Sequence, residues 1–239
     1  MDALARLSGI DDAKSHMKKR AIVAEQPAQP GSADSRRPPG PLEHATFVIG
    51  AAEPAQLPAD GVREVAFAGR SNAGKSSAIN ALARMTRLAH ASRTPGRTRQ
   101  INFFRLRNGA LVADLPGYGY AAVPQAIKRT WQDFLGSYVT SRSTLIGLVL
   151  IVDARHGLKA LDLDLLEGFL PSGRPVMILA TKIDKLNVAE GRASVAAIER
   201  TLVDAFGEAA RGVTVVAFSA TARRGVVEAD DVLRQWLEA

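Results

Sequence analysis

The stretch GRSNAGKSS at residues 69–77 decides the fold. It follows the β-rich run VREVAFAG (62–69) and opens the helically spaced run SSAINALARM (76–85). A strand, a glycine-rich turn and a helix in this order present backbone N–H groups at a helix N-terminus, where phosphate groups bind. The stretch matches the phosphate-loop pattern G-x-x-x-x-G-K-[ST] at Gly69, Gly74, Lys75 and Ser76.

The alternation of strand-like and helical runs continues along the chain and predicts an α/β fold. Strands are expected at 62–69, 101–107, 111–116, 145–154, 174–184 and 213–220, and helices at 76–85, 124–139, 160–170, 195–206 and 226–237. This order indicates a mostly parallel six-stranded sheet with helices on both faces. The Asn-Gly pair at 108–109 predicts a hairpin, which adds one antiparallel edge strand.

Three further motifs follow expected strands. DLPG (114–117) offers a carboxylate for Mg²⁺ and a glycine amide for a terminal phosphate, TKID (181–184) ends another strand, and FSA (218–220) ends the last one. Ligands of open α/β sheets bind at the carboxyl ends of the strands. Four motifs in this order therefore predict a single nucleotide site.

The base can be read from Asp184. A carboxylate only accepts hydrogen bonds, and guanine presents N1–H and its 2-amino group as adjacent donors. Adenine has no N1–H and would leave the carboxylate unpaired, which is costly in a desolvated pocket. Lys182 can lay its aliphatic stem along the base, and FSA can offer backbone amides to guanine O6. The sequence thus predicts a guanine-nucleotide-binding domain of the Ras-like P-loop class.

The loop SRTPGRTRQ (92–100) carries three arginines and no acid. In a Ras-like domain this segment responds to the third phosphate of GTP, and the Thr98 hydroxyl can join Ser76 on Mg²⁺ when that phosphate is present. The nucleotide's charge is already matched by Lys75, the metal and backbone amides. We therefore expect the arginines to face an RNA backbone in the GTP state.

The net charge of +7 is local. No acidic residue occurs between Glu64 and Asp114, an interval with nine basic residues: Arg70, Lys75, Arg84, Arg87, Arg93, Arg97, Arg99, Arg105 and Arg107. The chain has 31 basic residues in total, so the other 22 lie outside this interval, as do all 24 acidic residues. Such a local excess indicates a polyanionic partner.

Residues 1–41 differ from the rest, with five of the twelve prolines at 27–41 and no periodic apolar pattern. We expect a disordered extension there and one folded domain over 42–239. The chain has no cysteine and no membrane-spanning apolar run, and its four histidines are scattered singly. Its first twenty residues lack an apolar core and contain acids, so we expect no signal or transit peptide. These features predict a cytoplasmic protein without a disulfide or thiolate metal site.

GRSNAGKSSAIN (69–80), SRTPGRTRQINFF (92–104), DLPGYGYA (114–121) and TKIDK (181–185) together resemble the EngB (YihA/YsxC) family of bacterial GTP-binding proteins, in the TrmE-Era-EngA-EngB-septin-like class. The likeness covers about residues 44–238. It implies a Mg²⁺-dependent GTPase that assists large ribosomal subunit assembly and is needed for normal cell division and septation. We expect a monomer with no DNA or membrane partner. The long N-terminal extension departs from the family's compact core.

Carried onto this chain, the resemblance and the motifs give one set of site residues. Those expected to bind the nucleotide are Gly69, Arg70, Ser71, Asn72, Ala73, Gly74, Lys75 and Ser76; Gly96, Arg97, Thr98, Arg99 and Gln100; Asp114, Leu115, Pro116 and Gly117; Thr181, Lys182, Ile183 and Asp184; and Phe218, Ser219 and Ala220. Ser76 and Thr98 are expected to ligate Mg²⁺.

Catalysis is the incomplete part of the prediction. Many Ras-like enzymes place a glutamine directly after the DxxG glycine, where this chain has Tyr118, which cannot orient water through an amide. We assign no catalytic residue and expect slow intrinsic hydrolysis. Asn72 is placed either to help hold K⁺ or only to stabilise the turn, and the sequence leaves both open. Asp153 and Arg155, near the end of a central strand, are interpreted either as members of a structural ion pair or as residues that support the site indirectly, and they are left outside it.

Two other functions compete with the leading one. The protein could instead be a division-linked interaction protein that uses GTP as a docking switch, with a partner on the helix expected at 124–139. In that helix Trp131, Phe134, Leu135 and Tyr138 lie at helical spacing, which is also typical of core contacts. A nucleoside kinase or ATPase is disfavoured by Asp184 and by the lack of a lid-like insert.

Overall fold

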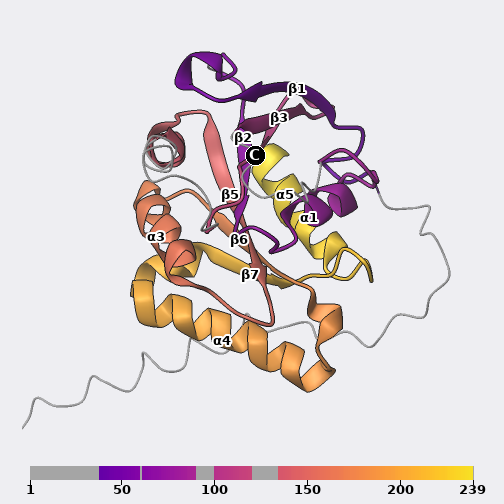
Figure 1. Cartoon of the computed structure of the whole chain (residues 1–239), viewed down its shortest axis with the longest axis vertical. Coiled ribbons are helices and arrows are strands. Elements are labelled where there is room, and N and C mark those ends of the chain that lie inside the picture. Colours follow the sequence, from indigo (N-terminus) through magenta and orange to yellow (C-terminus); the bar gives the residue numbers. More distant parts are fainter. Residues whose placement is uncertain (1–37, 60, 90–99, 120–133, 239) are drawn as a thin grey trace, which may run out of the picture. The chain divides into compact units, whose positions relative to one another are not determined.

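The computed structural model describes residues 38–59, 61–89, 100–119 and 134–238 (Figure 1). The chain divides into the units Met1–Pro38 and Pro39–Ala239, and every element below lies in the second. The strands are β1 (Thr46–Ala51), β2 (Glu64–Gly69), β3 (Ile101–Arg105), β4 (Leu111–Asp114), β5 (Leu145–Asp153), β6 (Val176–Thr181) and β7 (Val213–Ala217).

The helices alternate with these strands as expected. They are α1 (Lys75–Leu82), α3 (Ala160–Phe169), α4 (Val188–Phe206) and α5 (Val226–Glu238), with short 3-10 helices η2 (Pro54–Gln56), η3 (Leu170–Ser172), η4 (Ile183–Lys185) and η5 (Gly207–Gly212). Residues 134–141 are also helical, and the rest of the helix predicted over 124–139, residues 124–133, lies outside the described residues. Of its predicted core side chains, Phe134 and Tyr138 are buried.

All seven strands form one sheet in the order β1-β3-β4-β2-β5-β6-β7. The pairs from β4 through β7 are parallel, and β3 runs antiparallel to both of its neighbours. The predicted fold class is confirmed, with two differences. The sheet has seven strands where six were predicted, and the added strand β1 pairs with β3, so the hairpin strand is not at the edge.

The absence of β1 from the predicted strands has a physical explanation. TFVIGA in β1 has a burial pattern without alternation, because four of its six residues are exposed and only Ala51 is buried. A strand that buries one face is recognised by a period of two, and β1 does not have that period. Its register also shifts between Phe47 and Ile49. Pairing with β3 therefore defines β1, rather than its own pattern.

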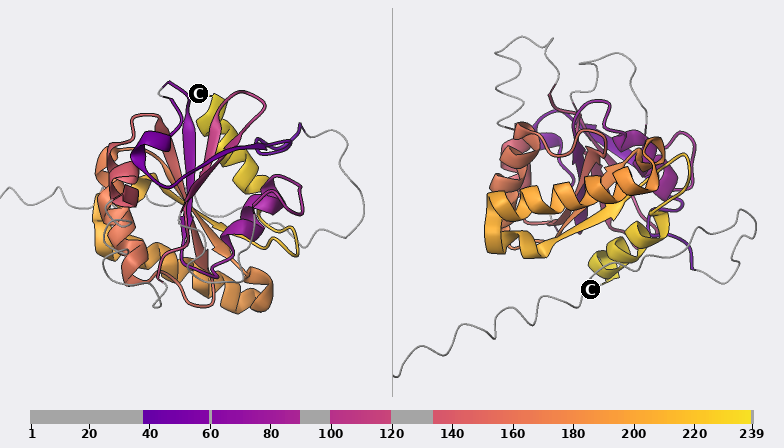
Figure 2. Two further views of the ribbon diagram at one scale, coloured as in Figure 1. Left: turned by 45° about the horizontal axis from the view of Figure 1, so that its top comes forward. Right: turned by 90° about the horizontal axis from the view of Figure 1, so that it is seen from below.

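The two faces of the sheet are covered by different helices. Leu166 and Phe169 of α3 and Ile198 of α4 belong to one buried cluster, together with side chains of residues 134–141. Ile79 and Leu82 of α1 and Leu233 of α5 belong to the other. Figure 2 shows α3 on one side of the sheet and α1 and α5 on the other.

Helix α4 begins seven residues earlier than predicted. Asn187 caps it by accepting a hydrogen bond from the Glu190 N–H at 2.9 Å, and the Glu190 carboxylate accepts from the Asn187 N–H at 2.9 Å. This reciprocal pair stabilises the first turn. The prediction depended on the apolar spacing of VAAIERTLVDAF, whereas the first turn of α4 is mostly exposed and is stabilised by its cap.

The segment before β1 packs against α1 and α5. Leu42 is fully buried, Glu43 pairs with Arg84 at 2.8 Å, and Arg234 donates to the Pro39 carbonyl at 3.0 Å. Within the part of the chain that the structure describes, no helix combines the length and apolar character needed to cross a bilayer.

Candidate functional site

The loop after β2 brings its backbone into a tight turn. Gly69 ends β2, Lys75 begins α1, and Gly74 at the N-cap has a φ of 104°, which disfavours any side chain there. Asn72 also has a positive φ of 65°. Asparagine tolerates this conformation better than most residues. The predicted strand, glycine-rich turn and helix are therefore present in the predicted order.

The DLPG segment lies directly against this loop. Ser71 N–H donates to the Tyr118 carbonyl at 2.9 Å, and Leu115 N–H donates to the Phe67 carbonyl at 2.9 Å. A Cβ on Gly117 would come within 3.2 Å of Ser71 Cα, so the two backbones approach closely. This packing leaves little room for a side chain at position 117.

Lys75 and Asp114 link the two motifs by their side chains. The Lys75 ammonium forms an ion pair with Asp114 Oδ1, and both side chains are largely buried. Asp114 is the last residue of β4, and β4 lies beside β2 in the sheet. The phosphate-loop lysine and the carboxylate predicted to support a metal therefore lie within contact distance.

The other two motifs meet at the carboxyl ends of β6 and β7. Thr181 ends β6, and its hydroxyl donates to the Val152 carbonyl at 3.0 Å and to the Ala73 carbonyl of the phosphate loop. Ile183 N–H donates to the Phe218 carbonyl at 3.2 Å. Thr181, Ile183 and Phe218 thus support the site with backbone and buried side-chain contacts.

Asp184 is held by a serine of the FSA motif. Ser219 Oγ donates to Asp184 Oδ1 at 2.6 Å and accepts from the Ala222 N–H at 3.0 Å. The hydrogen bond from Ser219 lowers the pKa of Asp184 below its usual value, with a smaller contribution from Lys185. The side chain is therefore an ionised, acceptor-only group at neutral pH.

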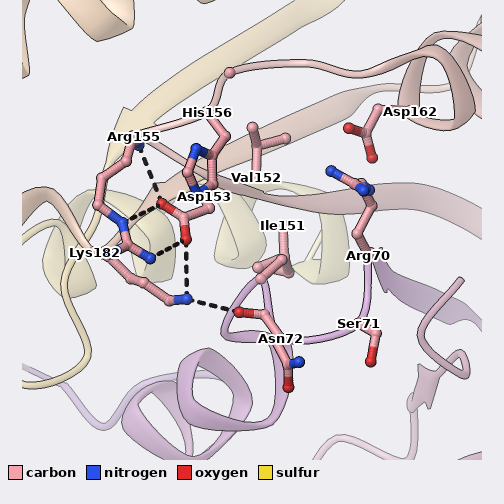
Figure 3. Close-up of a pocket in the computed structure, with 12 residues that line it drawn as sticks. Arg70, Ser71, Asn72, Ile151, Val152, Asp153, Arg155, His156, Asp162 and Lys182 are labelled. Atoms are coloured by element: carbon pink, nitrogen blue, oxygen red, sulfur yellow. Dashed lines mark hydrogen bonds and ion pairs between the residues drawn. The ribbon is translucent and has the colours of Figure 1, made fainter. Parts of the chain in front are cut away.

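A cavity of about 230 Å³ lies beside the phosphate loop (Figure 3). Its wall includes Arg70, Asn72, Asp153, Asp162 and Lys182. Lys182 donates to the Asn72 carbonyl at 2.7 Å and pairs with Asp153 Oδ2 at 2.9 Å. Arg155 completes the group with two side-chain bonds to Asp153. Figure 3 shows this group on one side of the cavity and Arg70 directed toward Asp162 on the other.

Tyr118 is half-buried, and its side chain is hydrogen-bonded to the first turn of α3. Its hydroxyl donates to Asp162 Oδ1 at 2.7 Å, and Asp162 Oδ2 accepts from the Lys159 N–H at 2.9 Å. Burial raises the pKa of both Tyr118 and Asp162, and the adjacent Asp162 charge raises that of Tyr118 further. The phenol is therefore a fixed hydrogen-bond donor at neutral pH.

The described residues include most of the predicted site. The structure brings together residues 69–76, 114–117, 181–184 and 218–220, whereas Gln100 is exposed immediately before β3. Gly96, Arg97, Thr98 and Arg99 lie outside the described residues. Asp153, Arg155 and Asp162 were not predicted. Asp153 had a usable sequence signal, since it lies near the carboxyl end of the strand predicted over 145–154.

The donors on this chain suit Mg²⁺. The ion prefers hard oxygen ligands, and Ser76 and Asp114 supply a hydroxyl and a carboxylate next to the phosphate loop. Asp114 is 5% exposed and already lies against the Lys75 ammonium. The chemistry of this donor set is therefore compatible with a phosphate-bound divalent cation.

The fold and the site define the class of this protein: it is a P-loop GTPase. Residues 64–182 match the protein family described as 50S ribosome-binding GTPase. The chain belongs to the EngB family of GTP-binding proteins, because it is 50% identical over 196 residues to the probable GTP-binding protein EngB of Azoarcus sp. (strain BH72). That alignment covers 82% of this chain and 92% of the relative.

Two further comparisons agree with this assignment. The probable GTP-binding protein EngB of Neisseria meningitidis serogroup B (strain MC58) is 49% identical over 176 residues, which cover 74% of this chain and 83% of that protein. A crystal structure of a probable GTP-binding protein EngB superposes with a TM-score of 0.57 at 19% identity. It covers 73% of this chain and 98% of that one, and at this identity it supports the fold.

Proposed function

We propose that this GTPase holds the phosphates of GTP and GDP on residues 69–76 and reads guanine with Asp184. Ser219 fixes the Asp184 carboxylate, and residues 218–220 supply amides to the base. Ser76 and Thr98 ligate Mg²⁺, and Asp114 supports the ion through water. When bound, Mg²⁺ neutralises charge on the phosphates. Asp114, Pro116 and Gly117 position the third phosphate relative to the phosphate loop.

Intrinsic hydrolysis is slow in this proposal. The side chain that follows Gly117 is committed to Asp162, and it carries no amide to align a water molecule. Positioning and charge neutralisation are then only partly supplied by the chain itself. A partner surface or a monovalent cation completes the site.

We propose potassium as that monovalent cation, with Asn72 on the phosphate loop as its candidate ligand. The Asn72 carbonyl accepts from Lys182, while its side chain makes no hydrogen bond within the described ranges. That side-chain oxygen is available to a cation, although the positive φ of Asn72 also suits a purely structural turn residue. Equal hydrolysis rates in K⁺ and Na⁺ buffers would exclude the cation role.

The biological role that we propose is a GTP-dependent switch in assembly of the large ribosomal subunit, required for normal division and septation. Three features support it: the description of the matched family as 50S ribosome-binding, the EngB relatives, and the acid-free segment with nine basic residues between Glu64 and Asp114. We place the protein in the cytoplasm as a monomer, with ribosomal RNA as its polyanionic partner.

The observation that carries the proposal is the meeting of four motifs at the carboxyl ends of β2, β4, β6 and β7. The test is sucrose-gradient cosedimentation with purified ribosomal subunits, in GDP and in a non-hydrolysable GTP analogue. We expect cosedimentation with the large subunit only in the analogue, and a steep loss of binding as salt rises, because phosphate contacts release counterions.

Matched charge reversals sharpen this test. Arg97→Glu in the basic loop is expected to abolish cosedimentation, and Arg192→Glu on α4 is expected to retain it. Nucleotide affinity of both variants is measured separately with fluorescent GDP, so that a nucleotide defect is not mistaken for a lost RNA contact. Equal cosedimentation in the two nucleotides, or binding insensitive to salt, would contradict the proposed switch.

A further inference from the structure

Asp153 ends β5 and lies outside the four motifs, yet it is joined to one of them. Its Oδ1 accepts from the Arg155 backbone N–H at 3.1 Å and from Arg155 Nε at 2.9 Å. Its Oδ2 accepts from Arg155 Nη2 at 2.7 Å and pairs with Lys182 Nζ at 2.9 Å. Each carboxylate oxygen thus has two donors, so Asp153 has no remaining role as a direct acceptor for a ligand.

Lys182 is held between two elements. Its ammonium contacts Asp153 Oδ2 on β5 and the Asn72 carbonyl on the phosphate loop (Figure 3). Its backbone φ of 59° is also unusual for a residue other than glycine. Lysine side chains have high rotamer entropy, so two fixed oxygens at the tip restrict the path of the whole aliphatic stem.

The charges explain why one carboxylate is needed there. Arg155 and Lys182 are two cations that share the Asp153 carboxylate. Partial burial acts to raise the pKa of Asp153, but hydrogen bonds from Arg155 and Lys182 outweigh it and keep the pKa well below its usual value. Without that negative charge, the two cations would repel each other, and Lys182 would retain only the Asn72 carbonyl.

We propose that Asp153 is a positioning residue for guanine binding, which acts by fixing Lys182, and that Arg155 in turn fixes Asp153. This inference rests on the proposed guanine site, in which the Lys182 stem lies along the base next to Asp184. Asp153 ends β5 and Thr181 ends β6, and the two residues pair in register. In this proposal the carboxyl ends of both strands contribute residues to the base site.

The test measures the Kd for fluorescent GDP in the full-length protein carrying Asp153→Asn. The amide keeps the shape of the side chain but loses its charge, so we expect the Kd to rise about three- to tenfold, as for one charge-assisted hydrogen bond in a partly exposed position. The matched control Asp204→Asn removes the same charge from an exposed position on α4, and its Kd should not change.

A double-mutant cycle separates positioning from general damage. Lys182→Met keeps the apolar stem and removes the ammonium. If Asp153 acts through Lys182, adding Asp153→Asn to Lys182→Met produces no further loss of affinity, whereas independent effects would multiply. Arg155→Gln changes a side chain that is 41% exposed. It should weaken GDP binding about two- to threefold when Asp153 and Lys182 are both intact, and have no further effect when either is substituted. If Asp153→Asn fails to fold, Arg155→Gln replaces it in the test.

The outcomes distinguish this inference from the site on which it rests. An unchanged Kd for Asp153→Asn beside a weakened Lys182→Met would overturn the inference and leave the guanine site intact. Multiplying losses in the double variant would also overturn it, because Asp153 would then act on another group. An unchanged Kd for Lys182→Met would overturn the proposed base contact of Lys182, and the inference with it.

Discussion

Single residues determine which purine the site accepts. Asp184 is fixed by the Ser219 hydroxyl at 2.6 Å, and this hydrogen bond lowers further the pKa of a carboxylate that is already ionised at neutral pH. An acceptor-only side chain matches the adjacent donors of guanine and rejects a base that presents an acceptor there. The selectivity of the site therefore depends on one carboxylate and on the serine that orients it.

Asp184→Asn should exchange guanine for xanthine. The asparagine amide donates a hydrogen bond to the C2 carbonyl of xanthine, where guanine carries its amino group. We expect affinity for GDP to fall about a hundredfold or more, because two charge-assisted hydrogen bonds are lost and one donor faces another. Competition titrations with GDP and xanthosine diphosphate measure this. An unchanged preference for GDP would show that Asp184 does not read the base.

At the level of elements, α5 carries an acid on its buried side. Val226, Ala229, Asp230, Leu233 and Leu237 are the buried positions of this helix. Asp230 is 5% exposed, and its Oδ1 has no hydrogen-bond partner within the described residues. It faces Gly40 of the segment before β1, with Arg84, Arg234, Glu43 and Asp231 as the surrounding charges. Burial raises its pKa to about 6.

This acid makes stability depend on pH. The folded state holds the Asp230 proton up to about pH 6, whereas the unfolded chain releases it near pH 4, so the free energy of unfolding falls as pH rises through this window. The loss is about 3 kcal/mol, since one pKa unit corresponds to about 1.4 kcal/mol. Asp230→Asn should remove most of this decline and be the more stable protein at pH 7.5.

Urea unfolding of wild type and Asp230→Asn at pH 4.5, 6 and 7.5 measures that difference, and subtraction removes the effects of other titrating groups. Asp204→Asn is the control, because it removes a carboxylate from an exposed position on α4. A variant less stable than wild type at pH 7.5 would mean that the Asp230 carboxylate has a stabilising partner.

A glycine sets how closely α5 packs on the sheet. A Cβ on Gly147 of β5 would lie 2.6 Å from Trp236 Cε3. Gly147→Ala should therefore lower the free energy of unfolding by about 1–3 kcal/mol through overpacking. Gly136→Ala in the helical residues 134–141 is the matched control. Nothing lies within 4 Å of its new Cβ, so a gain of about 0.5–1 kcal/mol is expected in the same urea assay.

At the level of the whole sheet, one edge presents exposed apolar side chains. The edge strand β1 exposes Phe47, Val48 and Ile49, with Phe47 60% exposed, and TFVIGA contains neither charge nor proline. Unpaired backbone groups beside apolar side chains favour association between sheet edges. Val48→Lys should raise the concentration at which light scattering detects association, without changing GDP affinity. Equal scattering curves would show that this edge does not limit solubility.

The sequence predicted most of the fold because its strands are long apolar runs separated by helices. It predicted where the four motifs meet, because parallel strands place their carboxyl ends together. It could not predict β1, whose residues lack alternation, or the earlier start of α4, which depends on a reciprocal cap. An ion-pair role for Asp153 and Arg155 was among the alternatives, but the contacts of Asp153 with Lys182 and of Asp162 with Tyr118 were missed, because these residues are distant in sequence.

Tyr118 and Tyr138 each donate a hydrogen bond to a buried carboxylate. Tyr118 donates to Asp162 at 2.7 Å, and Tyr138 donates to the fully buried Glu64, also at 2.7 Å, which Arg142 holds from the other side. Each phenol is tied to a carboxylate of a different element, one on α3 and one on β2. A movement of the DxxG turn would therefore break the Tyr118–Asp162 hydrogen bond or displace α3 with it.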